Sequence, residues 1–382
     1  MFNLSRTKNP IRISLVAASL LAASSALTQP ADKQPVKIGV TLPLSGPLAV
    51  NGRNYQNAIN LAVKKINADG GILKGTLVEV IIDDDKGVAE EGVSTVKKLI
   101  SRDKVDALVT GAISSPALAQ KEVSREARMI HVIITAQHKD ITLQGHPYLF
   151  RLNTTVEMGS AALLKYVVGS LKPKTIWFLG VNDDYGRSVA QAYKSMFDKA
   201  GIKMLGTEFY NKDDTDFLVY LIKGKATQPD LVMLAAPSDA IAATILRQKK
   251  QIGFNTPVAQ AAGVLTKTLV NLAGDAADGV YSADSWVRTL DNPQNKWFIE
   301  NYEKEFSLPA GKQEAVAYES ILFLTQAIDK AGTAKDSDKI ASVFRDTTFF
   351  GPRGAISFDQ IGQALATDYP IVVQNKELLL AH

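Results

Sequence analysis

Short apolar runs with β-type composition alternate with longer segments of helical spacing from residue 35 onward. The runs predicted as strands are Val36–Leu42, Leu77–Ile82, Ala107–Thr110, Val132–Thr135, Thr175–Leu179, Lys203–Glu208, Leu231–Ala235, Val258–Gln260 and Tyr369–Gln374. The segments predicted as helices are Asn54–Ala68, Ala89–Ser101, Pro116–Ala127, Tyr185–Ala200, Asp216–Lys223, Ala240–Gln251, Asn295–Phe306, Ala317–Ala331 and Ser337–Phe344. This alternation predicts an α/β fold in which parallel sheets carry helices on both faces.

The alternation restarts once, near Arg151–Val156, and both series begin with a strand, a turn and a long helix. We therefore predict two similar Rossmann-like lobes, and the length of 382 residues agrees with two domains. The first lobe is predicted over residues 36–153 plus 283–356, and the second over 154–282 plus 357–382. Open α/β sheets bind ligands outside the carboxyl ends of their strands, so function is expected in the loops that follow the strands.

The first residues have the features of an export signal. Residues 1–12 contain Arg6, Lys8 and Arg12 and no acid, and residues 13–31 contain no charge. Small residues follow the apolar stretch, with Ser24-x-Ala26 as the cleavage signature. The alternative, a membrane anchor, is disfavoured because the apolar stretch is short and rich in alanine and serine. We predict residues 1–26 to be a signal peptide and the mature protein to be exported and free in solution.

Several classes of site are disfavoured by composition. The chain has no cysteine, which excludes disulfides, thiolate metal sites and the lipid anchor of a lipoprotein. Its four histidines show no metal-binding spacing, so no metal or cofactor is expected. The formal charge of +4 comes without a basic run, which argues against nucleic acid as a partner. Phosphate-loop, dinucleotide and hydrolase motifs are missing from the strand–turn–helix contexts, so we predict that the chain is not an enzyme.

The first predicted lobe offers a site for a carboxylate. A glycine and two serines follow the strand that ends at Thr110, in the segment GAISSP. We predict Ser115 to cap the next helix, with Pro116 in its first position. Ser114 and the free N–H groups of that helix end suit an anion. Ala136 and Gln137 end the neighbouring strand and should lie beside Ser114.

Other residues offer walls for the rest of a ligand. Tyr185 follows a strand of the second predicted lobe in the segment NDDYG, and Trp286 is either an aromatic wall or ordinary core. Asn51, Pro237 and Ala262 complete the predicted ligand-binding set. The acid runs at 83–85 and 213–214 lack the spacing of a calcium loop and are interpreted as helix caps.

Six segments, in this order and spacing, carry a family resemblance: IGVTLPLSGPLAVNG, AINLAVKKINADGGILKG, IIDDD, GAISSP, NDDYGRS and LAGDAADGVYS. The chain resembles the periplasmic substrate-binding proteins of branched-chain amino acid ABC transporters over nearly all of the mature sequence. The resemblance implies a type I periplasmic-binding fold, with two lobes joined by three crossovers. It also implies a small-molecule ligand captured by hinge closure and a membrane permease as partner. We expect a monomer.

The resemblance also assigns roles to residues. The family binds the ligand carboxylate through residues that match Ser114, Ala136 and Gln137, although the family typically has threonine where Gln137 stands. Its cleft tyrosine matches Tyr185. The glutamate expected to pair a ligand ammonium is missing, because Ala262 stands near its place in the segment AQAAG.

A buried ammonium without a carboxylate costs several kcal/mol in effective terms. The sequence therefore favours a carboxylate ligand without an amine, such as an aromatic acid or a 2-oxo acid. A branched-chain or other amino acid remains an alternative ligand, and a ligand-sensing receptor subunit remains an alternative function.

Overall fold

The computed structural model describes residues 1–2 and 34–381. The predicted signal peptide, residues 1–26, lies outside the described residues apart from its first two. Within the described part of the chain, no helix has both the length and the apolar character needed to cross a membrane.

The first sheet has five parallel strands in the order β2-β1-β3-β4-β5. Their bounds are β1 Val36–Leu42, β2 Val78–Asp84, β3 Ala107–Thr110, β4 His131–Ile133 and β5 Leu149–Arg151. β1 has the sequence VKIGVTL and is buried along nearly its whole length. Such continuous apolar runs are typical of parallel strands that helices cover on both faces.

The second sheet has seven strands in the order β15-β14-β10-β9-β8-β6-β7. Their bounds are β6 Thr175–Val181, β7 Lys203–Tyr210, β8 Leu231–Ala235, β9 Val258–Gln260, β10 Tyr281–Asp284, β14 Tyr369–Gln374 and β15 Glu377–Leu380. β6 to β10 are parallel, whereas β14 and β15 add an antiparallel edge. A small antiparallel sheet contains β11 Phe349–Gly351, β12 Gly354–Phe358 and β13 Ala364–Leu365.

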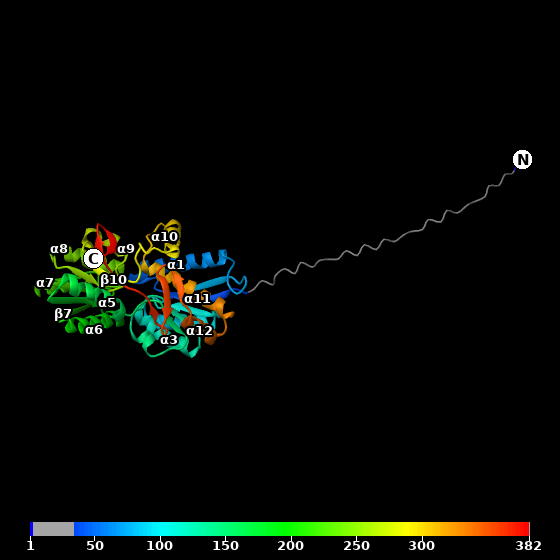
Figure 1. Ribbon diagram of the computed structural model, residues 1–382, viewed down its shortest axis with the longest axis horizontal. Coiled ribbons are helices and arrows are strands. Elements are labelled where there is room, and N and C mark those ends of the chain that lie inside the picture. The colour runs from blue at the N-terminus through cyan, green and yellow to red at the C-terminus, as the bar shows by residue number, and fades with distance from the viewer. Residues whose placement is uncertain (3–33, 382) are drawn as a thin grey trace. The chain divides into compact units, whose positions relative to one another are not determined.

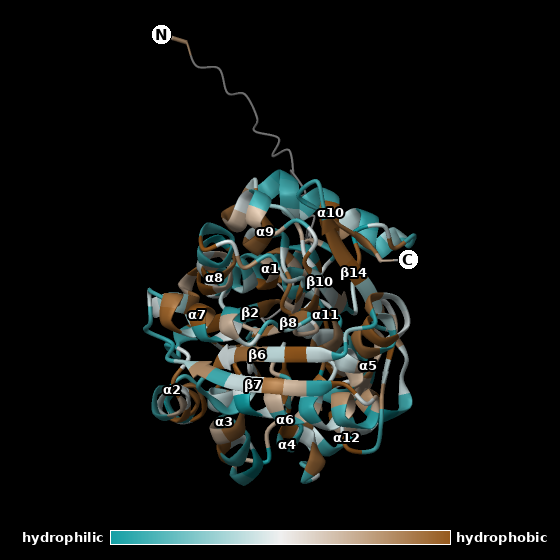
Figure 2. Ribbon diagram, turned by 90° about the vertical axis from the view of Figure 1, so that its left-hand side faces the viewer, coloured by the Kyte–Doolittle hydropathy of each residue, from teal (hydrophilic) through white to brown (hydrophobic). Residues whose placement is uncertain are grey.

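Helices surround both large sheets (Figure 1). Their bounds are α1 Ala49–Ala68, α2 Ala89–Ser101, α3 Ser114–Glu126, α4 Asp140–Leu143, α5 Val156–Tyr166, α6 Asp184–Lys199, α7 Leu218–Ala226, α8 Asp239–Gln251, α9 Lys267–Ala273, α10 Pro293–Phe306, α11 Lys312–Ala331 and α12 Ser337–Asp346. Short turns of other helix types lie at η1 Gly46–Leu48, η2 Val167–Leu171 and η3 Gly274–Ala276. Figure 2 shows the hydrophobic character of strand β14, while the helices mix hydrophilic and hydrophobic residues. The predicted α/β architecture is confirmed.

Each large sheet has its own hydrophobic core. Residues of α1, α10, α11 and α12 pack with the first sheet, and residues of α5 to α9 pack with the second. The chain crosses between the sheets after β5, after β10 and after β13. Phe358 and Ala364 pack in the first core, although the predicted lobe boundary assigned both to the second lobe.

The start of α3 differs from the prediction. The helix begins at Ser114 and its N-cap is Ile113, without a side-chain capping bond, so the assignment of Ser115 as N-cap was wrong. Pro116 occupies the third helical position instead of the first. The proline is tolerated there because N–H groups of the first turn have no partner within a helix.

Two long helices begin more than one turn earlier than predicted. α1 starts at Ala49, and its Gly52 packs so close to the chain that a Cβ would lie 2.1 Å from the Pro43 carbonyl oxygen. α11 starts at Lys312, and its polar first residues are buried. Glycine and polar residues normally weaken a helix prediction, so these extensions follow from packing between distant segments.

Candidate ligand-binding site

A cavity of about 300 Å³ lies where the carboxyl ends of the two parallel sheets face each other. The loops after β1, β2, β3 and β4 form one wall, and the loops after β6, β7, β8 and β9 form the other. The lining comprises Ser45, Gly46, Pro47, Leu48, Asn51, Tyr55, Lys86, Gly87, Val88, Ala112, Ile113, Ser114, Thr135, Ala136, Gln137, Val181, Asp183, Tyr185, Tyr210, Lys212, Asp213, Pro237, Ser238, Ile241, Gly263, Val264 and Gln313. This is the place that the strand-end rule predicts for a ligand.

Hydrogen-bond donors gather on the first wall. β3 and β4 are neighbours, so Ser114 at the start of α3 lies beside the loop that carries Ala136 and Gln137. The Gln137 side chain is 3% exposed, and its Nε2 has no hydrogen-bond partner among the described residues. The Ser114 Oγ accepts a long bond of 3.4 Å from the His138 N–H. A carboxylate placed here would accept from a hydroxyl, an amide and the helix end.

Arg151, the last residue of β5, holds this loop in place. Its guanidinium donates to the His138 carbonyl at 2.6 Å, to Thr142 Oγ1 at 3.0 Å and to Gln363 Oε1 at 2.6 Å. No carboxylate of the described residues forms an ion pair with it, and burial lowers its pKa to about 9. The loop that presents Gln137 is therefore fixed by a buried cation bound to neutral acceptors.

Two tyrosines define the second wall. Tyr185 lies in the first turn of α6, and Tyr210 ends β7, where it pairs with Val181 of β6. Burial raises the pKa of both phenols well above the ordinary value, so both are neutral. Neither hydroxyl has a hydrogen-bond partner within the described part of the chain. Sequence reasoning missed Tyr210, although its place at a strand's carboxyl end was the available signal.

The two walls touch each other beside the cavity. The Asn51 Nδ2 of α1 donates to Asp239 Oδ2 of α8 at 2.9 Å, and the Ser238 hydroxyl donates to the Pro47 carbonyl at 3.1 Å. Gln313 Nε2 donates to the Gly263 carbonyl at 3.0 Å. Asn51 therefore lines the cavity but uses its amide to join the walls.

Two buried carboxyl groups, those of Asp239 and Glu314, lie near this junction. Asp239 also accepts from Thr266 Oγ1 at 2.6 Å, and burial raises its pKa to about 6. Burial raises the pKa of Glu314 to about 7, and the negative charge of Asp239 adds to this shift. Both groups are therefore partly protonated near neutral pH in this arrangement.

The predicted site residues divide into two groups. Those that line the cavity are Ser114, Ala136, Gln137, Tyr185, Asn51 and Pro237. Ser115 and Ala262 do not line it, because Ser115 lies in the second position of α3 and the cavity wall continues at Gly263 and Val264. Trp286 lines a separate cavity of about 320 Å³ and donates from Nε1 to Asn295 Oδ1 at 2.7 Å within the first core.

The carboxylates in the lining are Asp183 and Asp213. Asp183 caps α6 by accepting the Gly186 N–H at 2.9 Å, and burial raises its pKa. Asp213 is exposed. No acid reaches the cavity from residues 259–263. In the described ranges, no three histidine, aspartate or glutamate side chains form a group suited to a metal ion.

A pair of α/β lobes with a cavity at the facing strand ends defines a ligand-binding protein. A family model described as periplasmic binding protein matches residues 35–377, so the chain belongs to this family. The leucine-, isoleucine-, valine-, threonine- and alanine-binding protein of Pseudomonas aeruginosa is 27% identical over 363 residues, which cover 95% of each chain.

Two solved structures extend the comparison. The branched-chain amino acid transporter substrate-binding protein LivJ from Streptococcus pneumoniae, in complex with isoleucine, has a TM-score of 0.83 at 25% identity and is covered over 98% of its length, against 90% of this chain. A solute-binding protein of an ABC transporter from Rhodopseudomonas palustris BisB5, in complex with 3,4-dihydroxybenzoic acid, has a TM-score of 0.83 at 25% identity; 91% of this chain and 95% of that one are covered. The predicted resemblance and type I periplasmic-binding fold are confirmed, as is the prediction of a binding protein that is not an enzyme.

Proposed function

We propose that this protein captures a small carboxylate without an amine, such as an aromatic acid or a 2-oxo acid, and presents it to an ABC-transporter permease. Its place of action is the periplasm, after export by the signal peptide. The observation that carries the proposal is Gln137 Nε2, which is buried without a hydrogen-bond partner among the described residues, in a cavity lining that also contains Ser114 at the start of α3. These neutral donors form an anion site in a cavity whose lining also contains apolar side chains.

The acids around the cavity argue against an ammonium group on the ligand. Asp183 is engaged as a helix cap and Asp213 is exposed, so neither is a free buried partner for a cation. A buried ammonium needs such a partner. The 3,4-dihydroxybenzoic acid in the Rhodopseudomonas palustris structure gives the same ligand class a precedent in this fold.

A branched-chain amino acid is the second candidate ligand. The names of the Pseudomonas aeruginosa relative and of the isoleucine complex favour it. In this chain Asp183 would then have to pair the ammonium while it caps α6.

A thermal-shift screen of amino acids, 2-oxo acids and aromatic acids tests the proposal. A ligand present at 100 times its dissociation constant stabilises the folded state by about 2.7 kcal/mol, which gives a visible shift. We expect shifts from aromatic or 2-oxo acids and none from leucine or isoleucine. Shifts confined to the amino acids would reject the proposed ligand class.

Affinity for the ligand should fall as the pH rises from 5.5 to 7.5. Asp239 and Glu314 have raised pKa values in this structure, where the two walls touch, and we expect ordinary values near 4 if separation of the walls exposes them to water. Closure then takes up protons, so it is favoured at low pH and weakened as the pH rises through 6 to 7. Titration calorimetry across this range measures the effect.

The neighbours of these two carboxyl groups also influence their pKa values, and so the pH dependence of binding. Asp239 meets Asn51 and Thr266, and Glu314 lies near Asn54 and Lys312. Asp239→Asn removes one of the two titrating groups and should flatten the profile. An equally steep profile in this variant would show that the junction does not couple protons to closure.

A further inference from the structure

Two tyrosines on the second wall of the cavity have buried hydroxyl groups that form no hydrogen bond with the described residues. Tyr185 is 5% exposed and Tyr210 is fully buried, and both line the cavity. Neither hydroxyl forms a hydrogen bond with any described residue. Buried hydroxyls are normally paired, because leaving one unpaired costs free energy. A pair of such groups on one wall therefore points to a ligand.

The fold holds both rings on the second wall. Tyr210 is in register with Val181 at the end of β6, and Tyr185 starts α6 directly beyond that strand. The Tyr210 ring packs edge-to-face against Phe217 at 5.3 Å between centroids. Ser114 and Gln137 lie on the opposite wall, at the strand ends of the other sheet. A ligand carboxylate on the first wall thus leaves the tyrosines for a different part of the ligand.

The chemistry of that second part follows from the tyrosines. Burial keeps both phenols neutral, so each hydroxyl can donate one hydrogen bond and accept others. An apolar group would leave both hydroxyls unpaired. A ligand hydroxyl has one donor and two acceptor positions, so it can pair with both tyrosines at once.

Apolar side chains also line the cavity. They include Ile113, Val181, Ile241 and Val264, and the volume of about 300 Å³ admits only a small ligand. We propose that the ligand is a hydroxylated aromatic carboxylic acid, whose ring hydroxyl binds Tyr185 and Tyr210. This inference rests on the proposed function, and it adds Tyr210 as a residue that determines specificity.

Titration calorimetry with benzoate, 3-hydroxybenzoate and 4-hydroxybenzoate tests the proposal. The readout is the ratio of the affinity for the better hydroxybenzoate to the affinity for benzoate. We expect a ratio of at least tenfold in the natural protein, because benzoate leaves two buried hydroxyls unpaired. In Tyr210→Phe and Tyr185→Phe the ratio should fall several-fold, and in the double variant it should approach one.

Tyr220→Phe is the matched control. Its hydroxyl donates to Asp214 Oδ2 at 3.0 Å, and Tyr220 is not part of the cavity lining. This variant should keep the full ratio. Thermal unfolding of the ligand-free proteins checks folding. Tyr210→Phe should be at least as stable as the natural protein, because the hydroxyl it loses has no partner among the described residues.

The outcomes distinguish failure of this inference about the ligand hydroxyl from failure of the proposed carboxylate capture. Binding of benzoate with no preference for a hydroxyl would overturn this inference and leave carboxylate capture intact. A preference that survives in the double variant would also overturn it. If no carboxylate of any kind binds, the proposed function itself is wrong.

Discussion

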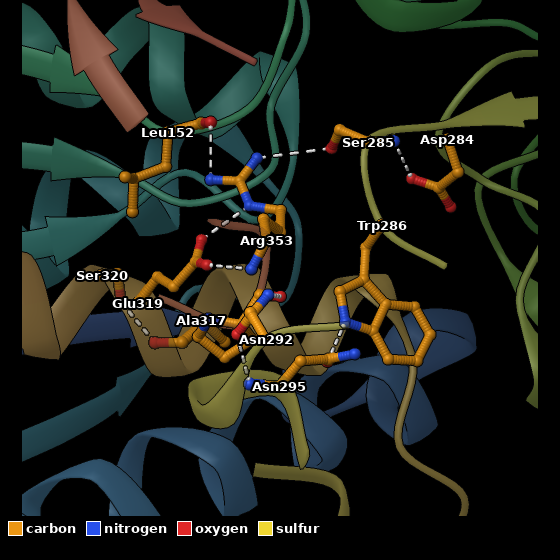
Figure 3. A network of polar contacts seen from close by, with 11 residues as sticks. Leu152, Asp284, Ser285, Trp286, Asn292, Asn295, Ala317, Glu319, Ser320 and Arg353 are labelled. Atoms are coloured by element: carbon orange, nitrogen blue, oxygen red, sulfur yellow. Dashed lines mark hydrogen bonds and ion pairs between the residues drawn. The ribbon is translucent and has the colours of Figure 1, made fainter. Parts of the chain in front are cut away.

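Arg353→Met should destabilise the folded protein by about 3–5 kcal/mol, the usual cost of removing one partner of a buried ion pair. The Arg353 Nε donates to Glu319 Oε2 at 2.6 Å, and neither side chain has any exposed surface. The same guanidinium donates to the Leu152 carbonyl at 3.1 Å and to Ser285 Oγ at 3.3 Å (Figure 3). Leu152 and Ser285 begin the first and second crossovers, so one side chain ties the two crossing segments together.

Urea unfolding of the natural and variant proteins measures this effect. Arg288→Met is the matched control, because Arg288 also pairs with a glutamate, Glu303, but both side chains are partly exposed. Exposed pairs contribute about 0–1 kcal/mol. An equal loss of unfolding free energy in the two variants would contradict a special role for Arg353 at the crossovers.

Replacing both carboxylate donors should have the largest effect on binding. Each hydrogen bond to a charged group contributes about 1.5–3 kcal/mol, so Ser114→Ala combined with Gln137→Leu should weaken carboxylate binding by roughly 10² to 10⁴-fold. The fold should tolerate the change, because Gln137 Nε2 has no partner among the described residues and the bond to Ser114 Oγ is long.

Titration calorimetry with the carboxylate that gives the largest shift in the thermal-shift screen measures the loss of affinity. Ser115→Ala is the control, since Ser115 lies next to Ser114 but outside the cavity lining. An affinity in the double variant within a few-fold of the natural protein would remove both residues from the ligand site.

The periodic parts of the sequence predicted the fold well. Continuous apolar runs such as Val36–Leu42 and Leu231–Ala235 appear as buried strands at their predicted positions. Local pattern is sufficient there because each run packs between helices whatever its distant neighbours are. Some short strands, such as β5 and β13, were missed because so few residues carry no periodic signal, whereas the short strands β3 and β9 were predicted at their observed bounds.

Residues whose role depends on distant partners were the hardest to predict. Lys312 and Glu314 look like exposed polar residues, yet they are buried where the two walls meet. Arg353 gives no local sign that it contacts both Leu152 and Ser285. Trp286 was predicted for the ligand site but lines another cavity, because its indole N–H bonds to Asn295. Ser114 and Gln137, in contrast, were chosen from their loop position after a strand, and both line the cavity.

A crystal structure of the complex with the best carboxylate from the thermal-shift screen tests the central claim most directly. We predict electron density for the ligand between the two walls, with its carboxylate within hydrogen-bond distance of Ser114 Oγ and Gln137 Nε2. Density in the cavity beside Trp286, or a carboxylate turned away from these two donors, would contradict the account.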